Sequence, residues 1–220
     1  IYARKNSQKL HKIQNFLLNE LDKKLFKEKL FKKLKKDFDN KKELIRENFI
    51  RTSDGSLCVG QNVILIDSLL KVIFKNIYLS TFNEDSYKFS MIAVGGYGRG
   101  ELAPYSDLDL LFLLPDFLNK SENQKIENVV QSILYFLWDL GFTVGHSTRS
   151  VQDCIQKSSE DSTISTSLLE KRLIIGNQEV FDALNDNLKN LINNTRTLDF
   201  VHAKLEESEF RHNKFGGSRY

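Results

Sequence analysis

A glycine-dense turn that leads into two aspartates constrains this chain more than any other feature. The turn spans residues 95–100, and Asp107 and Asp109 follow it at the start of an apolar stretch, 108–114. Its glycines are Gly95, Gly96, Gly98 and Gly100. Glycine lets the backbone approach an anion closely and point N–H groups at it, and carboxylates bind the divalent cations that neutralise phosphates. The combination predicts metal-assisted chemistry on a phosphate.

The spacing of the two aspartates favours a shared metal site. Strand residues two apart project from one face, with Cα atoms about 6.6 Å apart, so Asp107 and Asp109 are expected to point the same way. Carboxylates so placed suit one Mg²⁺ or a pair of ions. A solvated strand end is the alternative, although an acid within an apolar run costs free energy unless a metal or partner offsets it. Ser106 stands where its hydroxyl could bind phosphate or cap a turn.

The turn differs from the commoner phosphate-binding loops. It lacks the Gly-Lys-Ser/Thr ending of a P-loop, and its spacing does not match the dinucleotide-binding pattern G-x-G-x-x-G. Arg99 and Glu101 add charge to it. Arg99 either pairs with a phosphate or forms an internal ion pair with a nearby carboxylate.

Short apolar runs around the turn predict a small sheet. They cover residues 88–94, 108–114 and 142–147. A capping box that begins at Ser121 starts a helix, which Gly141 ends, so the third strand returns along the sheet after a crossover. We assign this core to residues 83–176.

Helices are predicted on both sides of the core. Before it, helical spacing of apolar residues and a break at Asp54-Gly55-Ser56 predict a helical N-terminal layer over 1–82. After it, residues 177–220 form a helical extension. The predicted helices cover 2–39, 62–81, 162–175 ended by Gly176, 178–193 capped by Asn177, and 200–213.

Composition narrows the class of protein. The 220 residues are 40% hydrophobic, enough for one buried core, and the net charge of +3 is too balanced to predict nucleic-acid binding. Lysines crowd the first fifty residues, but they share that stretch with apolar residues at helical spacing, which a solvated helix face explains. No apolar run reaches the roughly 18 residues of a membrane span.

Two isolated cysteines, Cys58 and Cys154, and the absence of a signal peptide favour a soluble, cytoplasmic protein without membrane or nucleic-acid partners. Because the chain starts at Ile1, we expect a fragment.

The run from Ala93 to Phe112 resembles the nucleotidyltransferase signature of the bifunctional uridylyltransferase/uridylyl-removing enzymes, which modify the nitrogen-regulatory PII protein. The resemblance continues through 137–141, 144–150 and 166–176 and covers roughly residues 60–220. It implies an α/β (α+β) fold of the polymerase-β-like nucleotidyltransferase type, a small mixed sheet flanked by helices, with helical N- and C-terminal layers.

The same resemblance implies a reaction. UMP would pass from UTP to a tyrosine hydroxyl of PII and release pyrophosphate, with Mg²⁺ as cofactor. Asp107 and Asp109 would be catalytic and metal-binding, and the nucleotide would be bound by Gly95, Gly96, Gly98, Arg99 and Ser106. Family members also carry an HD-type hydrolase domain that removes UMP and ACT domains that sense glutamine. Neither is seen here, and none of the four histidines precedes an aspartate, so the removing activity is not assigned to this chain.

This chain differs from the wider nucleotidyltransferase superfamily at the position expected for a third metal ligand. That superfamily usually supplies a third carboxylate from the neighbouring strand, where this chain has Gly145-His146. His146 either contacts phosphate or metal or has a structural role. Glu170 is a possible substitute, or else it has a helix-surface role or a role paired with Arg172. Glu101, His146, Glu170 and Arg172 are therefore secondary candidates.

Two alternatives stay open at this point. The chain could be a nucleotidyltransferase with another nucleotide or acceptor. It could also be a regulatory module that keeps a nucleotide-binding fold without catalysis.

Overall fold

The computed structural model describes residues 29, 31–82, 84 and 86–194. The chain divides into two compact units, Ile1–Thr52 and Ser53–Tyr220. In the first unit, residues 31–52 form one helix, so the predicted helix end near Asp39 is wrong. No glycine or proline occurs before Gly55, and the chain leaves the helix at Ser53, which has a left-handed φ of 55°. The predicted helical residues 2–28 lie outside the described residues.

Helix α2, Gly55–Phe82, opens the second unit and begins earlier than the predicted residue 62. Asp54 caps it, because the Leu57 N–H donates to Asp54 Oδ1 at 2.9 Å. By length and composition α2 is the one helix in the described ranges that could cross a membrane, yet 50% of that stretch is buried inside the structure, as in a core helix. Helix α2 lies in the same compact unit as the sheet. The N-terminal layer predicted from the sequence, residues 1–82, includes this helix.

The second unit holds a four-stranded mixed sheet in the order β3-β2-β1-β4. β1 pairs antiparallel with β2 and β4, and β2 pairs parallel with β3, as the predicted crossover requires. The strands are β1 Ser90–Ala93, β2 Leu108–Leu114, β3 Val144–Ser150 and β4 Arg172–Gly176. The predicted small mixed sheet with flanking helices is confirmed.

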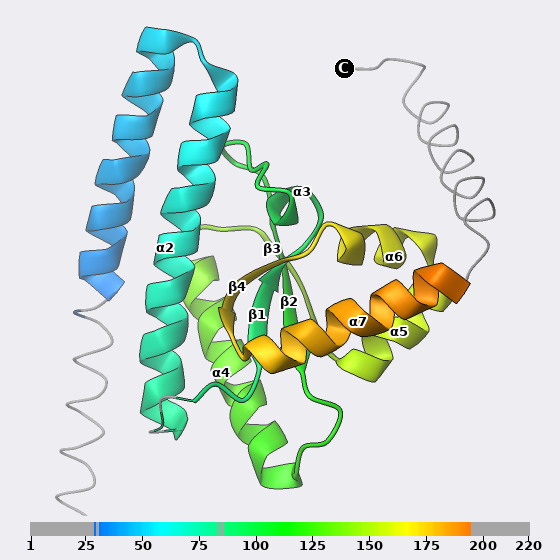
Figure 1. Ribbon diagram of the computed structural model, residues 1–220. Coiled ribbons are helices and arrows are strands. Elements are labelled where there is room, and N and C mark those ends of the chain that lie inside the picture. The colour runs from blue at the N-terminus through cyan, green and yellow to red at the C-terminus, as the bar shows by residue number, and fades with distance from the viewer. Residues whose placement is uncertain (1–28, 30, 83, 85, 195–220) are drawn as a thin grey trace, which may run out of the picture. The chain divides into compact units, whose positions relative to one another are not determined.

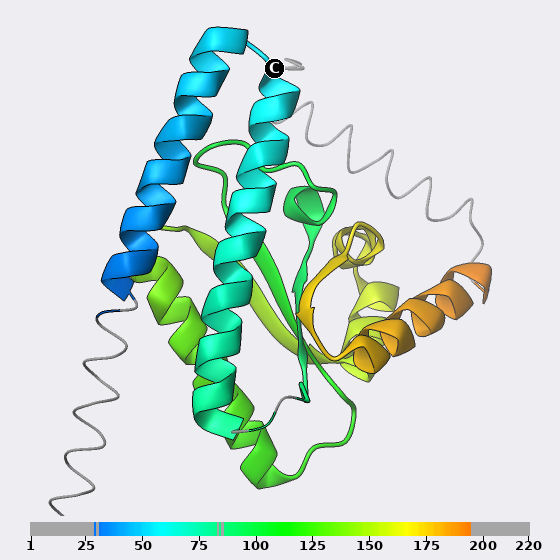
Figure 2. The same cartoon turned by 60° about the vertical axis from the view of Figure 1, so that its left-hand side comes forward.

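Helices cover both faces of the sheet. α2 and α4, Lys120–Asp139, lie on one side, and three shorter helices lie on the other (Figures 1 and 2). These are α5 Val151–Glu160, α6 Ser162–Leu169 and α7 Gln178–Asn194. Because side chains alternate along a strand, odd-numbered residues of β2 such as Leu111 and Leu113 pack with Val151, Leu168 and Leu184 of the second group. Even-numbered β2 residues therefore face α2 and α4.

The C-terminal half corrects one predicted helix. The helix expected over 162–175 ends at Leu169, and residues 172–176 form β4 instead. The edge of β1 that does not pair with β2 pairs with this run, so that Ile92 aligns with Leu173. Gly176 has a φ of 137° and contacts the Ser90 backbone so closely that a Cβ would clash. The sequence pattern does not predict this strand, because its pairing partner lies about 80 residues earlier in the chain.

Caps explain the other differences in helix boundaries. Asn119, not Ser121, caps α4 by accepting from the Glu122 N–H at 2.9 Å, while Gly141 ends that helix as predicted, with a φ of 87°. α5 was not predicted, although Ser150 and Asp153 form its capping box.

The Asn177 cap of α7 is confirmed, since its Oδ1 accepts from the Val180 N–H at 3.2 Å. The predicted strand 142–147 is displaced by a few residues, to Val144–Ser150. The predicted helix over 200–213 lies outside the described residues.

Candidate active site

The glycine turn connects β1 to β2 and includes the one-turn helix α3, Gly95–Gly98. Its backbone bonds to itself, with Gly98 N–H donating to Val94 O at 3.0 Å and Arg99 N–H donating to Gly95 O at 3.1 Å. Gly95 and Gly100 have φ values of 59° and 79°, which glycine adopts without strain. No side chain caps the N-terminus of α3, so its first N–H groups stay available.

Gly98 meets a different requirement, which is space. A Cβ at this position would collide with the carbonyl oxygen of Glu170 and lie 3.0 Å from Ala93 O. The turn therefore packs closely against Glu170, in the segment between α6 and β4. Two kinds of constraint, backbone angle and close packing, hold the same short turn.

Asp109 is the second residue of the inner strand β2, and its side chain is exposed at the start of that strand, beside the turn. A Cβ on Gly95 would lie 3.5 Å from Asp109 Oδ2, and one on Gly145 would lie 2.5 Å from Oδ1. The carboxylate therefore lies between the glycine turn and β3, with glycine on either side. The Val94 N–H also donates to Asp109 O at 3.1 Å, which fixes the strand to the turn.

Asp107 lies just before β2 and is exposed, so only Asp109 of the pair is a strand residue. The pKa of Asp109 is raised, first because neighbouring groups withdraw it partly from water and second because the Asp107 charge repels its ionised form. The two carboxylates are therefore close enough to interact.

The pair fits a divalent cation. Two interacting carboxylates, of which Asp109 has a raised pKa, are an oxygen-donor set that a divalent cation stabilises. Neither aspartate has an ion-pair partner in the described part of the chain. That part also contains no group of three acidic, histidine or cysteine side chains suited to a metal. On β3 the residue paired with Asp109 is Gly145, which has no side chain that could bind a metal. Strand β3 therefore supplies no third carboxylate beside Asp109.

His146 does not join this pair. It is in register with Leu110 and so projects from the face opposite Asp109. Its ring centroid lies 6.4 Å from that of Trp138 of α4, in an edge-on arrangement. The structure thus gives His146 an aromatic contact rather than a place beside Asp109.

Arg99 forms the internal ion pairs that the sequence left open. Its Nε lies 2.9 Å from Glu101 Oε2, and its Nη1 lies 2.7 Å from Glu170 Oε2. The hydrogen bonds that Arg99 donates to these two carboxylates raise its pKa. The arginine side chain remains 45% exposed at the surface of the turn. Glu170 therefore pairs with Arg99, and the expected pairing with Arg172 is wrong.

Arg172 lies behind the turn. Its guanidinium binds Asp67 of α2 with both nitrogens, at 2.6 and 3.1 Å, and Nη2 also donates to Tyr97 O at 3.3 Å. Since Arg172 pairs with Ala93 in register, it faces α2 rather than Asp109. Ser106 lies at the surface before Asp107, with its N–H bonded to Ala103 O at 3.1 Å.

Sequence reasoning missed three residues whose side chains link this loop to helix α2. Asn62 and Asp67 are polar positions on the apolar helix α2, and Tyr97 lies inside the turn. The one available signal was a polar side chain on an apolar helix, which predicts a buried hydrogen bond but not its partner.

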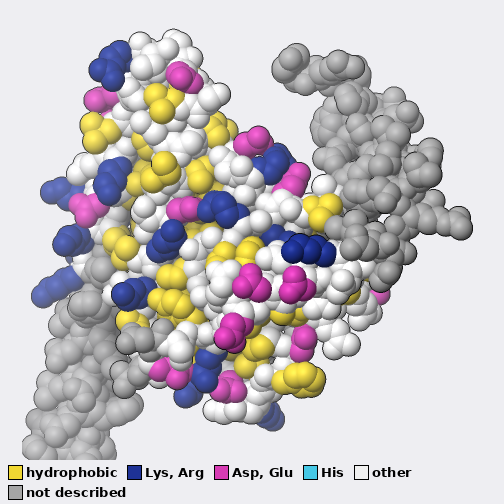
Figure 3. Space-filling view, viewed as in Figure 1, with side chains coloured by type: hydrophobic (Ala, Val, Ile, Leu, Met, Phe, Trp, Pro, Cys, Tyr) yellow, Lys and Arg dark blue, Asp and Glu magenta, His cyan; other side chains and the backbone are white. Residues whose placement is uncertain are grey.

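Figure 3 shows one face of the molecule. Over the sheet-containing unit, acidic and basic side chains are interspersed rather than gathered into a basic patch. On this face, the sheet-containing unit therefore shows no broad cationic patch of the kind that binds nucleic-acid backbones.

Comparison with known proteins gives the family of the core. Residues 76–175 match the nucleotidyltransferase domain model. The chain is 40% identical over 182 residues to a bifunctional uridylyltransferase/uridylyl-removing enzyme of Novosphingobium aromaticivorans, covering 81% of this chain and 20% of the relative. A relative with the same description from Azospirillum brasilense is 42% identical over 180 residues, covering 80% of this chain and 19% of the relative. The chain thus spans about a fifth of the length of these curated relatives.

A solved structure, a toxin-antitoxin with AMP-PNP, is also similar. It is 16% identical with a TM-score of 0.31, covering 64% of this chain and 98% of that chain. Similarity this low carries no functional conclusion.

Proposed function

Since residues 76–175 are a nucleotidyltransferase domain and the chain is homologous to bifunctional uridylyltransferase/uridylyl-removing enzymes, we propose that it transfers UMP from UTP to a protein. The acceptor we propose is a tyrosine hydroxyl of PII, and the second product is pyrophosphate. The observation that carries the proposal is the position of Asp109, between Gly95 and Gly145 and within electrostatic reach of Asp107.

The glycine turn is proposed to hold the triphosphate. Gly95 and Gly96 keep side chains away from the backbone, and Gly98 lets the turn pack against the Glu170 backbone. The uncapped N-terminus of α3 presents N–H groups to an anion. Ser106 lies on the approach to Asp107, where its hydroxyl can donate to a phosphate oxygen.

Asp107 and Asp109 are proposed to hold Mg²⁺. When bound, this cation would neutralise phosphate charge and favour departure of pyrophosphate. The two carboxylates supply its oxygen ligands. Arg99, already paired with Glu101 and Glu170, holds a positive charge at the mouth of the turn, where a phosphate can compete for it.

The chain's own contribution to the reaction is positioning. A rigid turn fixed to β2 sets the triphosphate against the carboxylates, so the acceptor hydroxyl meets an α-phosphorus of defined orientation. Cytoplasmic localisation and glutamine control through further domains are parts of the same proposal.

The test incubates the protein with MgUTP and purified PII and reads UMP attachment by mass spectrometry. Wild type should give UMP on one PII tyrosine, and Asp107→Asn/Asp109→Asn should give none. The control variant Asp116→Asn alters an exposed carboxylate that caps the α5 backbone, away from the turn, and should keep activity. Equal product from wild type and the double variant would refute the catalytic assignment.

A nucleotide panel separates the alternatives. ATP, CTP and GTP compared with UTP, at equal Mg²⁺, would identify a different donor. Metal-dependent UTP binding without transfer to PII or any other acceptor tested would favour a non-catalytic nucleotide-binding module.

A further inference from the structure

Two polar side chains of α2 contact the loop that carries the candidate site. Asn62 is 7% exposed, and its Nδ2 donates to Leu102 O at 2.9 Å. Asp67 Oδ1 accepts from the Tyr97 hydroxyl at 2.6 Å. Both residues precede the matched nucleotidyltransferase segment, which starts at residue 76.

Tyr97 is the point where three elements meet. Its side chain is 1% exposed, with the ring 5.4 Å from the Arg172 guanidinium carbon of β4. Its carbonyl accepts from Arg172 Nη2 at 3.3 Å and from the Gly100 N–H at 3.1 Å. Burial and the Asp67 hydrogen bond raise the pKa of Tyr97, so its hydroxyl stays a donor.

Asp67 is the residue on which this arrangement depends. Its carboxylate accepts hydrogen bonds from the Tyr97 hydroxyl and from two nitrogens of Arg172. Loss of the Asp67 charge would therefore leave the half-buried guanidinium of Arg172 without its ion-pair partner. The turn itself has few other side-chain supports, because most of its residues are glycine. Besides its own backbone hydrogen bonds, the turn is therefore held by contacts from α2 and β4.

We propose that Asp67, Tyr97 and Arg172 are positioning residues that hold the glycine turn in its phosphate-binding conformation. The proposal rests on the proposed function and extends the working site to α2, beyond the matched domain. Asn62 fixes the following loop through Leu102 in the same way.

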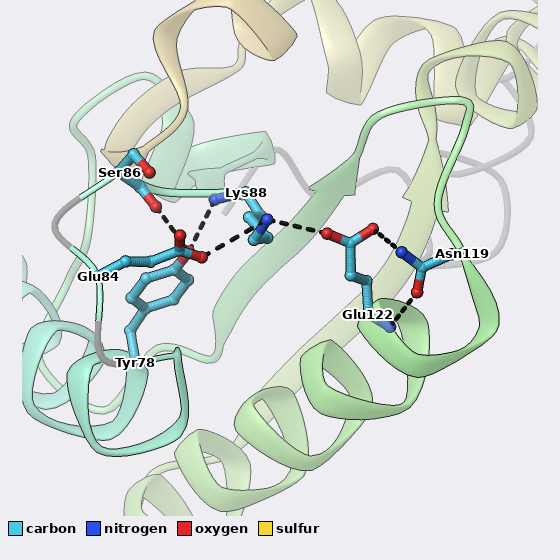
Figure 4. A network of polar contacts seen from close by, with 6 residues as sticks. All are labelled: Tyr78, Glu84, Ser86, Lys88, Asn119 and Glu122. Atoms are coloured by element: carbon cyan, nitrogen blue, oxygen red, sulfur yellow. Dashed lines mark hydrogen bonds and ion pairs between the residues drawn. The ribbon is translucent and has the colours of Figure 1, made fainter.

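The other end of α2 supplies matched controls. Tyr78 is also fully buried, and its hydroxyl donates to Ser86 O at 2.8 Å and accepts from the Lys88 N–H at 3.0 Å. Lys88 Nζ lies 2.9 Å from Glu122 Oε1, a carboxylate that also bonds Asn119 (Figure 4). This second network has the same chemistry but does not touch the turn.

The experiment compares Tyr97→Phe with Tyr78→Phe and Asp67→Asn with Glu122→Gln in the 220-residue chain. MgUTP binding is measured by calorimetry, and thermal unfolding is measured in parallel. We expect Tyr97→Phe and Asp67→Asn to weaken MgUTP binding by roughly three- to tenfold, the value of one lost hydrogen bond. The controls should bind as wild type despite an equal or larger fall in Tm.

Amide hydrogen exchange of residues 95–102 without nucleotide gives a second measurement. Exchange there should be faster in Tyr97→Phe than in Tyr78→Phe, because Gly98, Arg99, Gly100 and Glu101 donate the bonds that close the turn. Unchanged binding and exchange in Tyr97→Phe and Asp67→Asn would overturn the proposal, as would loss of binding in all four variants in proportion to Tm. Wild type that fails to bind MgUTP would refute the proposed function instead, while the exchange comparison would still decide the positioning role.

Discussion

At the scale of single residues, glycines determine how the site is built. Gly95 and Gly100 supply backbone angles, Gly98 supplies room beside Glu170, and Gly145 leaves space for the Asp109 carboxylate. Glycine suits each of these positions, because a Cβ there would strain the backbone or collide with neighbouring atoms. The site is therefore defined as much by missing side chains as by the carboxylates.

Asp109→Asn should raise Tm in EDTA at pH 7. The fold raises the pKa of Asp109, so the protonated form favours folding and this contribution is lost as pH rises above the unfolded value. A neutral amide avoids the cost of withdrawing a charge partly from water and also removes the repulsion by Asp107. The gain should be small because the side chain is exposed, and it should vanish near pH 3, measured by thermal unfolding.

Mg²⁺ should reverse that order of stability. Added Mg²⁺ is expected to raise the Tm of wild type and leave Asp109→Asn unchanged, because the variant lacks one ligand oxygen charge. A similar Mg²⁺ response in both proteins would place the cation elsewhere.

Gly98→Ala should cost stability on the order of 1–3 kcal/mol, since its methyl group meets the Glu170 backbone. Gly55→Ala is the control, because open space surrounds that position and alanine favours a helix. Urea unfolding measures both. Equal midpoints for Gly98→Ala and wild type would contradict the packing described here.

At the scale of elements, caps and pairing partners set the boundaries. β1 has only four residues yet binds strands on both edges, so it organises the sheet. β4 and α5 were missed for opposite reasons. β4 depends on a distant partner, whereas α5 begins with a capping box at Ser150 that is local in the sequence.

The start of α4 provides a test at this scale. Asn119→Ala should destabilise the protein by about 1 kcal/mol, because its Oδ1 caps the Glu122 N–H, while Ser121→Ala should change stability by less than roughly 0.5 kcal/mol. Chemical unfolding of both variants decides between the two caps. A larger loss for Ser121→Ala would restore the capping box predicted from sequence.

At the scale of the whole molecule, the compact unit that holds the sheet begins at Ser53, whereas the matched domain begins at residue 76. The interval contains most of α2, including the buried Leu70, Ile73 and Phe74. Helix α2 is thus both a core element and the support of the turn.

Truncation tests this boundary. A chain that starts at Ser53 should unfold in one cooperative transition, because the sheet and the helices that cover it all lie within this unit. A chain that starts at residue 76 should lose that transition, since the sheet face covered by α2 would be exposed to water. Circular dichroism melts of the two chains compare them directly. A cooperative melt from the shorter chain would show that α2 is dispensable.

The sequence by itself determined the turn, the strand that follows it and the family. Local chemistry suffices there, because glycine angles, an apolar run and two acids two residues apart lie within one short segment. Strand β2 has the predicted bounds, and the Asn177 cap of α7 is in place.

Only the tertiary structure decided which side chains meet. His146 proved to face away from Asp109, Glu170 proved to pair with Arg99, and Asp67 proved to hold Arg172 across 105 residues. Such contacts depend on strand order and on the face to which each element turns, and neither is encoded in the spacing of neighbouring residues. Long-range pairing is a property of the folded sheet, and it emerges only when all four strands are in register.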